Sequence, residues 1–124
     1  MITKGLEVLV VYDSSMNRKL FSMLLKKMGN AVDEAGSGAE CLEMVCKKKY
    51  DLIFMDHMMP EMDGIETLNR MKYLEQSLNR GTPVVALTAN DMKGGKEFYL
   101  DVGFNGYLEK PVIPRRLEEL IQIL

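Results

Sequence analysis

The stretch DLIFMDHMMPEMDG, residues 51–64, decides the fold of this chain. Its first five residues form a nearly continuous apolar run, which is typical of a strand covered on both faces of a parallel sheet. The run ends in Asp56, and a carboxylate at the end of a buried strand is costly to desolvate unless another group compensates it. Pro60 and Gly64 shape the loop that follows, and Asp63 is placed to cap the next helix. The rest of the chain must supply what compensates Asp56.

Apolar runs of the same kind recur along the sequence and alternate with helical patterns. The run at 31–35, AVDEA, is the most polar of them, which suits an edge strand. Strands that alternate with helices in this way predict an α/β fold with a parallel, doubly wound sheet. Order 2-1-3-4-5, the flavodoxin-like (βα)5 arrangement, is the common small topology of this type. The predicted strands are residues 6–12, 31–35, 51–55, 82–88 and 104–108.

Two helical segments carry specific expectations. The first has an apolar stripe at i, i+4 spacing, which predicts its buried face. That stripe consists of Met16, Leu20, Leu24 and Met28, with Phe21 and Leu25 beside them. The second segment, residues 90–102, contains Gly94 and Gly95, each of which costs about 1 kcal/mol in a helix interior relative to alanine. We therefore expect a short or labile helix there.

Length and composition indicate one domain over residues 1–124. The chain is 47% hydrophobic and has a formal net charge of −2, which gives no sign of direct nucleic-acid binding. No apolar run approaches the ~20 residues of a membrane-spanning helix, so we expect no membrane insertion. The two cysteines, Cys41 and Cys46, have neither disulfide nor metal-site spacing. Unpaired thiols indicate a reducing compartment and hence a cytoplasmic protein.

Polar residues stand at the carboxyl ends of four predicted strands. Asp13 follows the first strand, Asp56 the third, Thr88 ends the fourth, and Lys110 lies just beyond the fifth. The carboxyl ends of parallel strands share one edge of the sheet, where ligands bind in such folds. Two carboxylates held close repel unless a cation lies between them, and oxygen ligands suit Mg²⁺. A hydroxyl and an ammonium group could bind phosphoryl oxygens, and an aspartate can be the nucleophile. The pattern predicts metal-assisted phosphoryl transfer.

The segments VLVVYD, NRKL, DLIFMDHMMPEMDG, VVALTAN and GYLEKP, in this order and spacing, carry a family resemblance over nearly the whole chain. The chain resembles the receiver domain of two-component response regulators, and in particular the receivers of hybrid sensor histidine kinases. The resemblance implies that Asp56 accepts a phosphoryl group from a phosphohistidine on a histidine kinase or histidine phosphotransfer protein. It also implies a switch on the surface of the fourth helix, fifth strand and fifth helix, which acts on an output domain or protein.

The resemblance further assigns roles to matching positions. Asp13, Asp56 and the backbone carbonyl of Met58 would bind Mg²⁺. Thr88 and Lys110 would contact the phosphoryl group. The remaining implied roles are switch residues at Thr88 and Tyr107, dephosphorylation tuning by Met58 and Asn90, and a cis bond before Pro111.

Tyr12 departs from the family pattern, because receivers usually carry two adjacent acids where this chain has Tyr12 and Asp13. One interpretation is a working phosphoacceptor with weaker Mg²⁺ affinity. A second is a pseudo-receiver, a binding module that signals without phosphorylation. A third is that Tyr12 is an introduced substitution. A metal-dependent phosphohydrolase is disfavoured, because Met58 stands where such enzymes need a second carboxylate. His57 has no second ligand-type partner in the sequence, and we expect it to be an exposed loop side chain rather than a metal ligand.

Overall fold

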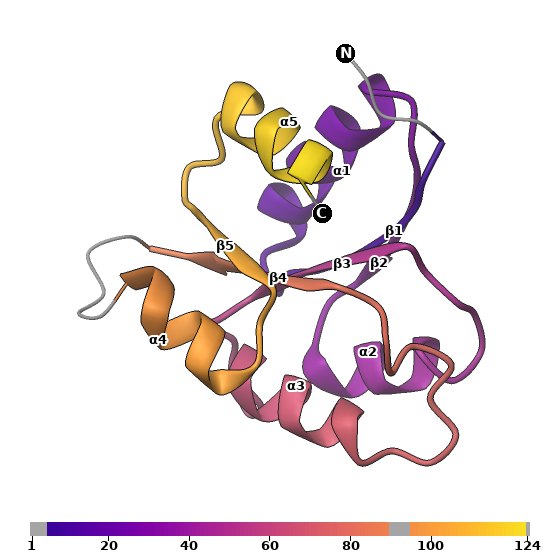
Figure 1. The fold of residues 1–124 in the computed structure, drawn as a ribbon. Coiled ribbons are helices and arrows are strands. Elements are labelled where there is room, and N and C mark those ends of the chain that lie inside the picture. Colours follow the sequence, from indigo (N-terminus) through magenta and orange to yellow (C-terminus); the bar gives the residue numbers. More distant parts are fainter. Residues whose placement is uncertain (1–4, 90–94, 124) are drawn as a thin grey trace.

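The computed structural model describes residues 5–89 and 95–123 of the 124-residue chain. Strands and helices alternate throughout these residues, as the sequence predicts (Figure 1). The elements are β1 (Glu7–Val11), α1 (Ser15–Lys27), β2 (Ala31–Ala35), α2 (Gly38–Met44), β3 (Leu52–Asp56), α3 (Gly64–Lys72), β4 (Val84–Thr88), α4 (Gly95–Val102), β5 (Gly106–Glu109) and α5 (Pro114–Ile123).

The five strands form one parallel sheet in the order β2-β1-β3-β4-β5, which confirms the predicted topology. Every residue of β3 and β4 is buried, whereas β2 is mostly half-exposed, as expected of an edge strand. The predicted fifth strand begins too early. β5 starts at Gly106 because Asn105 belongs to the preceding turn, where its side chain accepts a hydrogen bond of 2.9 Å from the backbone N–H of Val84.

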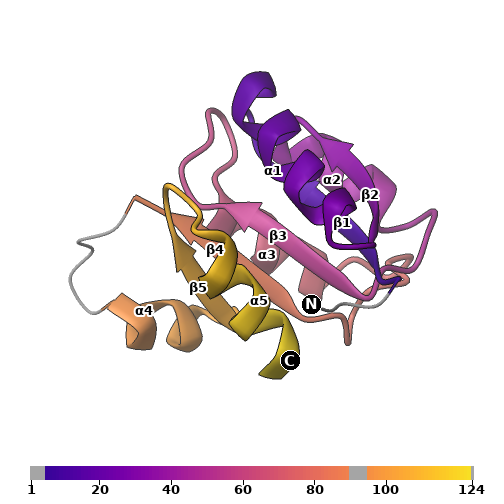
Figure 2. The same ribbon diagram turned by 90° about the horizontal axis from the view of Figure 1, so that it is seen from above.

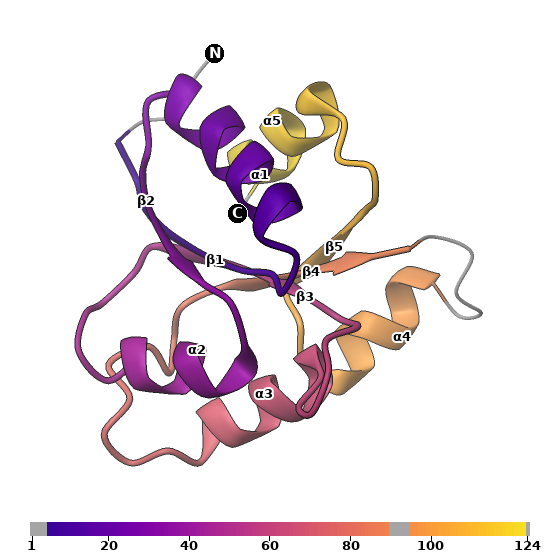
Figure 3. The same cartoon turned by 180° about the vertical axis from the view of Figure 1, so that it is seen from behind.

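Helices cover both faces of the sheet. α1 and α5 lie on one face, and α2, α3 and α4 lie on the other (Figures 1 and 3). The view from above places α1 over the β1 side and α5 over the β5 side (Figure 2). Side chains of β1 alternate between the two layers, with Val8 and Val10 under α1 and α5 and with Leu9 and Val11 facing α2, α3 and α4. Because all five strands are parallel, the connections after β1, β3, β4 and β5 lie at one edge of the sheet.

The structure confirms part of the predicted apolar face of α1 and corrects its first turn. Met16 and Leu20 are 69% and 58% exposed, whereas Phe21 and Leu25 are buried against the sheet. Leu24 and Met28 are half-buried and pack against the same layer, so the buried face is centred on Phe21 and Leu25, the residues beside the stripe. The ring of Phe21 meets that of Phe54 on β3 edge to face, with 4.9 Å between centroids.

α4 is a short helix, Gly95–Val102, within the segment predicted to be weak. Its first residue has a positive φ of 44°, a conformation that glycine adopts without a steric cost. Gly94 and the rest of 90–94 lie outside the described residues. Tyr99 anchors the helix to the sheet with a completely buried side chain.

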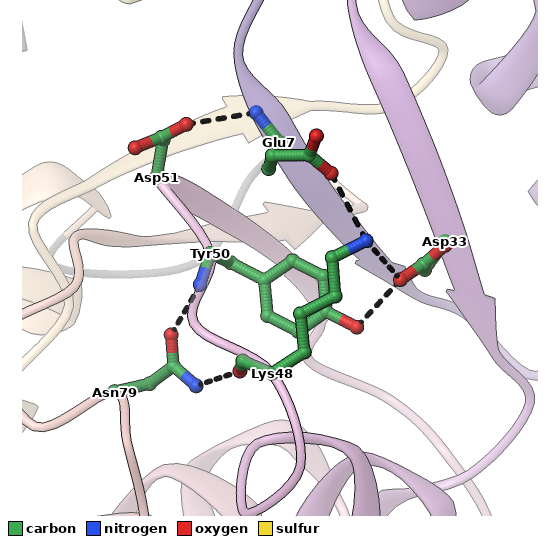
Figure 4. A network of polar contacts seen from close by, with 6 residues as sticks. All are labelled: Glu7, Asp33, Lys48, Tyr50, Asp51 and Asn79. Carbon is green, nitrogen blue, oxygen red and sulfur yellow. Dashed lines mark hydrogen bonds and ion pairs between the residues drawn. The ribbon is translucent and has the colours of Figure 1, made fainter.

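A polar network ties the amino-terminal ends of the strands together, at the edge opposite Asp56 of β3 and Thr88 of β4 (Figure 4). The Tyr50 hydroxyl donates a 2.8 Å hydrogen bond to Asp33, and Lys48 Nζ lies 3.1 Å from the same carboxylate and 3.0 Å from Glu7. Asn79 accepts a hydrogen bond of 2.8 Å from the Tyr50 backbone N–H. Burial pushes the pKa of Asp33 upward, but the hydrogen bonds from Tyr50 and Lys48 outweigh it and hold the pKa below its ordinary value.

Candidate phosphoacceptor site

Asp56 is the most deeply buried acid at the carboxyl edge of the sheet. It ends β3, between β1 and β4, and is only 1% exposed. Burial raises its pKa above the ordinary value, and the neighbouring Asp13 carboxylate raises it further, while Lys110 opposes both effects. Gly64 is required beside it, because a Cβ atom at that position would collide with the backbone oxygen of Asp56.

Lys110 compensates the Asp56 carboxylate, which answers the question that the end of β3 raises. Lys110 Nζ lies 2.8 Å from Asp56 Oδ1 and donates a hydrogen bond to it. The backbone fixes the position of this lysine, since its N–H donates to the carbonyl oxygen of Thr88 at 2.7 Å. The Lys110–Pro111 peptide bond is cis, as the family resemblance implies. Burial of the ammonium group lowers the pKa of Lys110, but the hydrogen bond and the negative charge of Asp56 outweigh burial and raise it above the ordinary value.

The remaining oxygen donors come from the loops after β1 and β3. Asp13 lies on the exposed side of the site, close enough to Asp56 to affect its pKa. Met58 has an exposed side chain two residues beyond Asp56, so only its backbone carbonyl is a candidate ligand. Among residues 5–89 and 95–123, no group of three or more His, Cys, Asp or Glu side chains could hold a metal ion. Two carboxylates and a carbonyl oxygen fit Mg²⁺, which takes one or two carboxylates and keeps several waters.

The side chain of Tyr12 is buried in the core, whereas its neighbour Asp13 is exposed at the site. The Tyr12 side chain is 8% exposed and packs with Val10 and Phe21 in the layer under α1 and α5. Strand alternation continues one residue past β1, so position 12 shares the inward face of Val10. The ring also lies beside the lysine, with Lys110 Nζ 5.1 Å from its centroid, a cation–π distance. The tyrosine therefore contributes packing and a contact with Lys110 where the family pattern has a negative charge.

Thr88 is hydrogen-bonded to Tyr99, which in turn is hydrogen-bonded to His57, and the sequence patterns assign neither residue to the site. Tyr99 Oη donates a 2.8 Å hydrogen bond to Thr88 Oγ1, and His57 Nδ1 lies 2.9 Å from the same Tyr99 oxygen. The prediction that His57 is an exposed loop side chain is wrong. It is 9% exposed, because its ring packs edge to face against Tyr99 with 5.5 Å between centroids. No periodicity or motif marks Tyr99, since it meets Thr88 only when α4 docks on the sheet.

Tyr107 and Asn90 complete the predicted positions. Tyr107 on β5 is half-buried, and its ring stacks on Tyr99 with 5.8 Å between centroids and 17° between planes. Asn90 lies outside the described residues. The structure thus gathers Asp13, Asp56 and Lys110 around one point, with Tyr12 beneath the lysine, and joins Thr88 and Tyr107 through Tyr99.

A five-stranded parallel sheet with a buried aspartate at the end of β3, paired with a lysine beyond β5, is the arrangement of a two-component signalling domain. The chain belongs to the response regulator receiver domain family, whose model matches residues 8–122. It is 41% identical over 127 residues to "Hybrid signal transduction histidine kinase B" of Dictyostelium discoideum. That match covers 95% of this chain but only 6% of the relative's length.

Two solved structures carry information about such sites. The receiver domain of the sensor histidine kinase PA1611 from Pseudomonas aeruginosa is 31% identical, has a TM-score of 0.83 and matches 97% of both chains. It is described with a magnesium ion coordinated in its active site cleft. The second is the Saccharomyces cerevisiae receiver domain of Ssk1 in complex with the histidine phosphotransfer protein Ypd1. It is 28% identical with a TM-score of 0.85, over 98% of this chain and 90% of that one.

Within the described residues, no helix combines the length and the apolar character needed to cross a membrane.

Proposed function

We propose that this domain is a phosphoacceptor in a two-component phosphorelay and that Asp56 receives the phosphoryl group. The observation that carries the proposal is the 2.8 Å pair between Lys110 Nζ and Asp56 Oδ1, on a carboxylate almost fully removed from solvent and next to Asp13. A structural ion pair does not require a second carboxylate beside the first, since like charges held close repel. A site for a divalent cation and a phosphoryl anion gives that arrangement a use.

The proposed donor is a phosphohistidine on a histidine kinase or a histidine phosphotransfer protein. An oxygen of the Asp56 carboxylate attacks phosphorus, the phosphorus–nitrogen bond to the donor imidazole breaks, and that nitrogen takes up a proton. The product is an acyl phosphate on Asp56, which water later hydrolyses by attack on phosphorus. The transfer is slow and self-catalysed, so the domain is a signalling module rather than a turnover enzyme.

The chain's own residues have distinct parts in this proposal. Lys110 pairs with Asp56 before transfer and with a phosphoryl oxygen afterwards, which stabilises the charge that accumulates there. Thr88 donates its hydroxyl hydrogen to another phosphoryl oxygen. Asp13, Asp56 and the Met58 carbonyl would hold Mg²⁺, which supplies neutralisation of phosphoryl charge when bound. Met58 and Asn90, two positions beyond the acceptor and the threonine, would tune the rate of hydrolysis.

The proposed response to phosphorylation is a rearrangement of the surface formed by α4, β5 and α5, with Thr88 and Tyr107 as switch residues. A hollow of about 730 Å³ runs along β5 and α5 and is lined in part by Tyr107, Ile113 and Leu120. This apolar lining suits an output domain or protein.

We also propose that the domain, residues 1–124, acts in the cytoplasm and neither enters a membrane nor binds nucleic acid directly.

A pseudo-receiver is the second candidate, and the burial of Tyr12 favours it. Tyr12 stands where the family pattern has a negative charge, and its ring makes a cation–π contact with Lys110. In that case the domain would dock its partner regardless of phosphate. The retained Asp13, Asp56 and Lys110 constellation supports the phosphoacceptor instead.

Incubation with a small phosphodonor such as acetyl phosphate, with and without Mg²⁺, tests the proposal. Mass spectrometry should find one added phosphoryl group in the wild type with Mg²⁺ and none in Asp56→Asn. Chelation of Mg²⁺ should abolish labelling. Equal labelling of the wild type and Asp56→Asn, or no labelling of either with Mg²⁺, would refute the phosphoacceptor role.

A further inference from the structure

A buried chain of hydrogen bonds runs from the loop after β3, through α4, to the end of β4. It consists of His57, Tyr99 and Thr88, with donor–acceptor distances of 2.9 and 2.8 Å. All three side chains are buried, and the Tyr99 side chain is fully enclosed. Leaving a buried polar atom without a hydrogen-bond partner is costly, so each of these three side chains should use its donor and acceptor atoms.

The direction of this hydrogen-bond chain follows from one assignment, the donation from Tyr99 Oη to Thr88 Oγ1. A tyrosine hydroxyl has one hydrogen, which Tyr99 donates to Thr88 Oγ1. The Tyr99 oxygen must therefore accept from His57, which requires a hydrogen on His57 Nδ1. Thr88 Oγ1 then accepts from Tyr99, so the hydroxyl hydrogen of Thr88 is free to bond a group other than Tyr99. In the opposite direction, Thr88 would donate to Tyr99 and would have no hydrogen left for another acceptor.

Thr88 lies next to the phosphoacceptor in the sheet. Asp56 is opposite Leu87 in the β3–β4 register, so Thr88 is one residue further along the neighbouring strand. The Thr88 hydroxyl can therefore donate its hydrogen to an anion bound at the carboxyl edge of the sheet. Consecutive donors polarise one another, so each bond strengthens the next, and the effect is larger when the final acceptor is charged.

We propose that Tyr99 and His57 are positioning residues that hold the Thr88 hydroxyl as a hydrogen-bond donor toward a phosphoryl group on Asp56. This inference rests on the proposed phosphoacceptor function. Because Tyr99 belongs to α4 and stacks on Tyr107 of β5, the same hydroxyl links the phosphoryl site to the α4–β5–α5 surface. A displacement of α4 moves the donor that orients Thr88, and a phosphoryl group that draws on Thr88 favours the docked position of α4.

The direction of the chain can be read without phosphorylation. His57 is the only histidine in the sequence, so its imidazole nitrogens give an unambiguous long-range ¹H–¹⁵N spectrum. We expect a hydrogen on Nδ1 in the wild type and a change in the Nδ1 signal in Tyr99→Phe. A neutral ring with its hydrogen on Nε2 and a bare Nδ1 would reverse the chain and overturn the inference.

Binding of beryllofluoride with Mg²⁺, as a stand-in for the phosphoryl group, tests the consequence. Tyr99→Phe keeps the ring and its packing but removes the hydroxyl, and should weaken binding about 3- to 10-fold. Tyr50→Phe is the matched control, since it removes another buried tyrosine hydroxyl, bonded to Asp33 at the opposite edge of the sheet. It should lower the unfolding temperature without changing beryllofluoride affinity.

A second pair of variants separates donation from packing. His57→Asn keeps an N–H donor near the Nδ1 position and should retain most of the affinity, whereas His57→Leu should lose as much as Tyr99→Phe. If the wild type binds beryllofluoride and Tyr99→Phe binds it equally well, the positioning role is refuted and the phosphoacceptor function stands. If the wild type binds none, the proposed function itself fails.

Discussion

Replacing Tyr12 with aspartate separates the two consequences of the buried ring, which are core packing and a missing negative charge. The ring is largely enclosed between Val10, Phe21 and Lys110, so its loss should destabilise the fold. Removing a buried aromatic side chain costs about 3–5 kcal/mol. A hollow of about 210 Å³ already borders Tyr12, so water can enter, and we expect the lower end of that range.

The added charge should act on Mg²⁺ in the opposite direction. A carboxylate about 5 Å from a doubly charged ion, in a water-like dielectric, attracts it by about 1.7 kcal/mol. That corresponds to an affinity gain of about tenfold or somewhat more. Without metal, the new charge repels the Asp56 and Asp13 carboxylates, so the stability penalty of Tyr12→Asp should shrink when Mg²⁺ is added.

Isothermal titration calorimetry with Mg²⁺ and urea unfolding measure the two effects, and Tyr12→Asn is the matched control. Asparagine removes the same ring and has nearly the same volume as aspartate, but it carries no charge. We expect about tenfold tighter Mg²⁺ binding in Tyr12→Asp alone, so saturating Mg²⁺ should stabilise Tyr12→Asp by about 1.4 kcal/mol more than it stabilises Tyr12→Asn. Identical Mg²⁺ affinities for the two variants would show that the missing charge does not limit the site.

Three further predictions concern residues around the site and the opposite edge. Lys110→Met should cost about 3 kcal/mol in urea unfolding, because it leaves the buried Asp56 charge unpaired, and Asp56→Asn in the same molecule should recover most of that loss. Gly64→Ala should destabilise by about 1–3 kcal/mol, since the new methyl group meets the Asp56 backbone, whereas Gly81→Ala, in open space, should change the unfolding midpoint little. Asp33 has a lowered pKa in the folded state, so its stabilising contribution is present above about pH 4 and is lost as the pH falls through its folded pKa; Asp33→Asn should flatten that part of the pH–stability curve, and an unchanged curve would contradict it.

The sequence by itself determined the topology and the main site. Near-continuous apolar runs mark strands buried on both faces, as β3 and β4 are, and polar residues at their ends must share an edge because the strands are parallel. Asp56 and Lys110 could therefore be placed together although 54 residues separate them. These features depend on local patterns and on the few ways in which parallel strands connect.

Only the tertiary structure decided how individual side chains fill the interior. The exposure of Met16 and Leu20 on α1, the burial of His57 and the contact between Tyr99 and Thr88 all depend on how a helix is rotated and docked on the sheet. Tyr12 likewise took its role from the space beneath Lys110. Such contacts join residues far apart in the chain through close packing, and no repeating pattern in one segment encodes the shape of the surface that another segment will present to it.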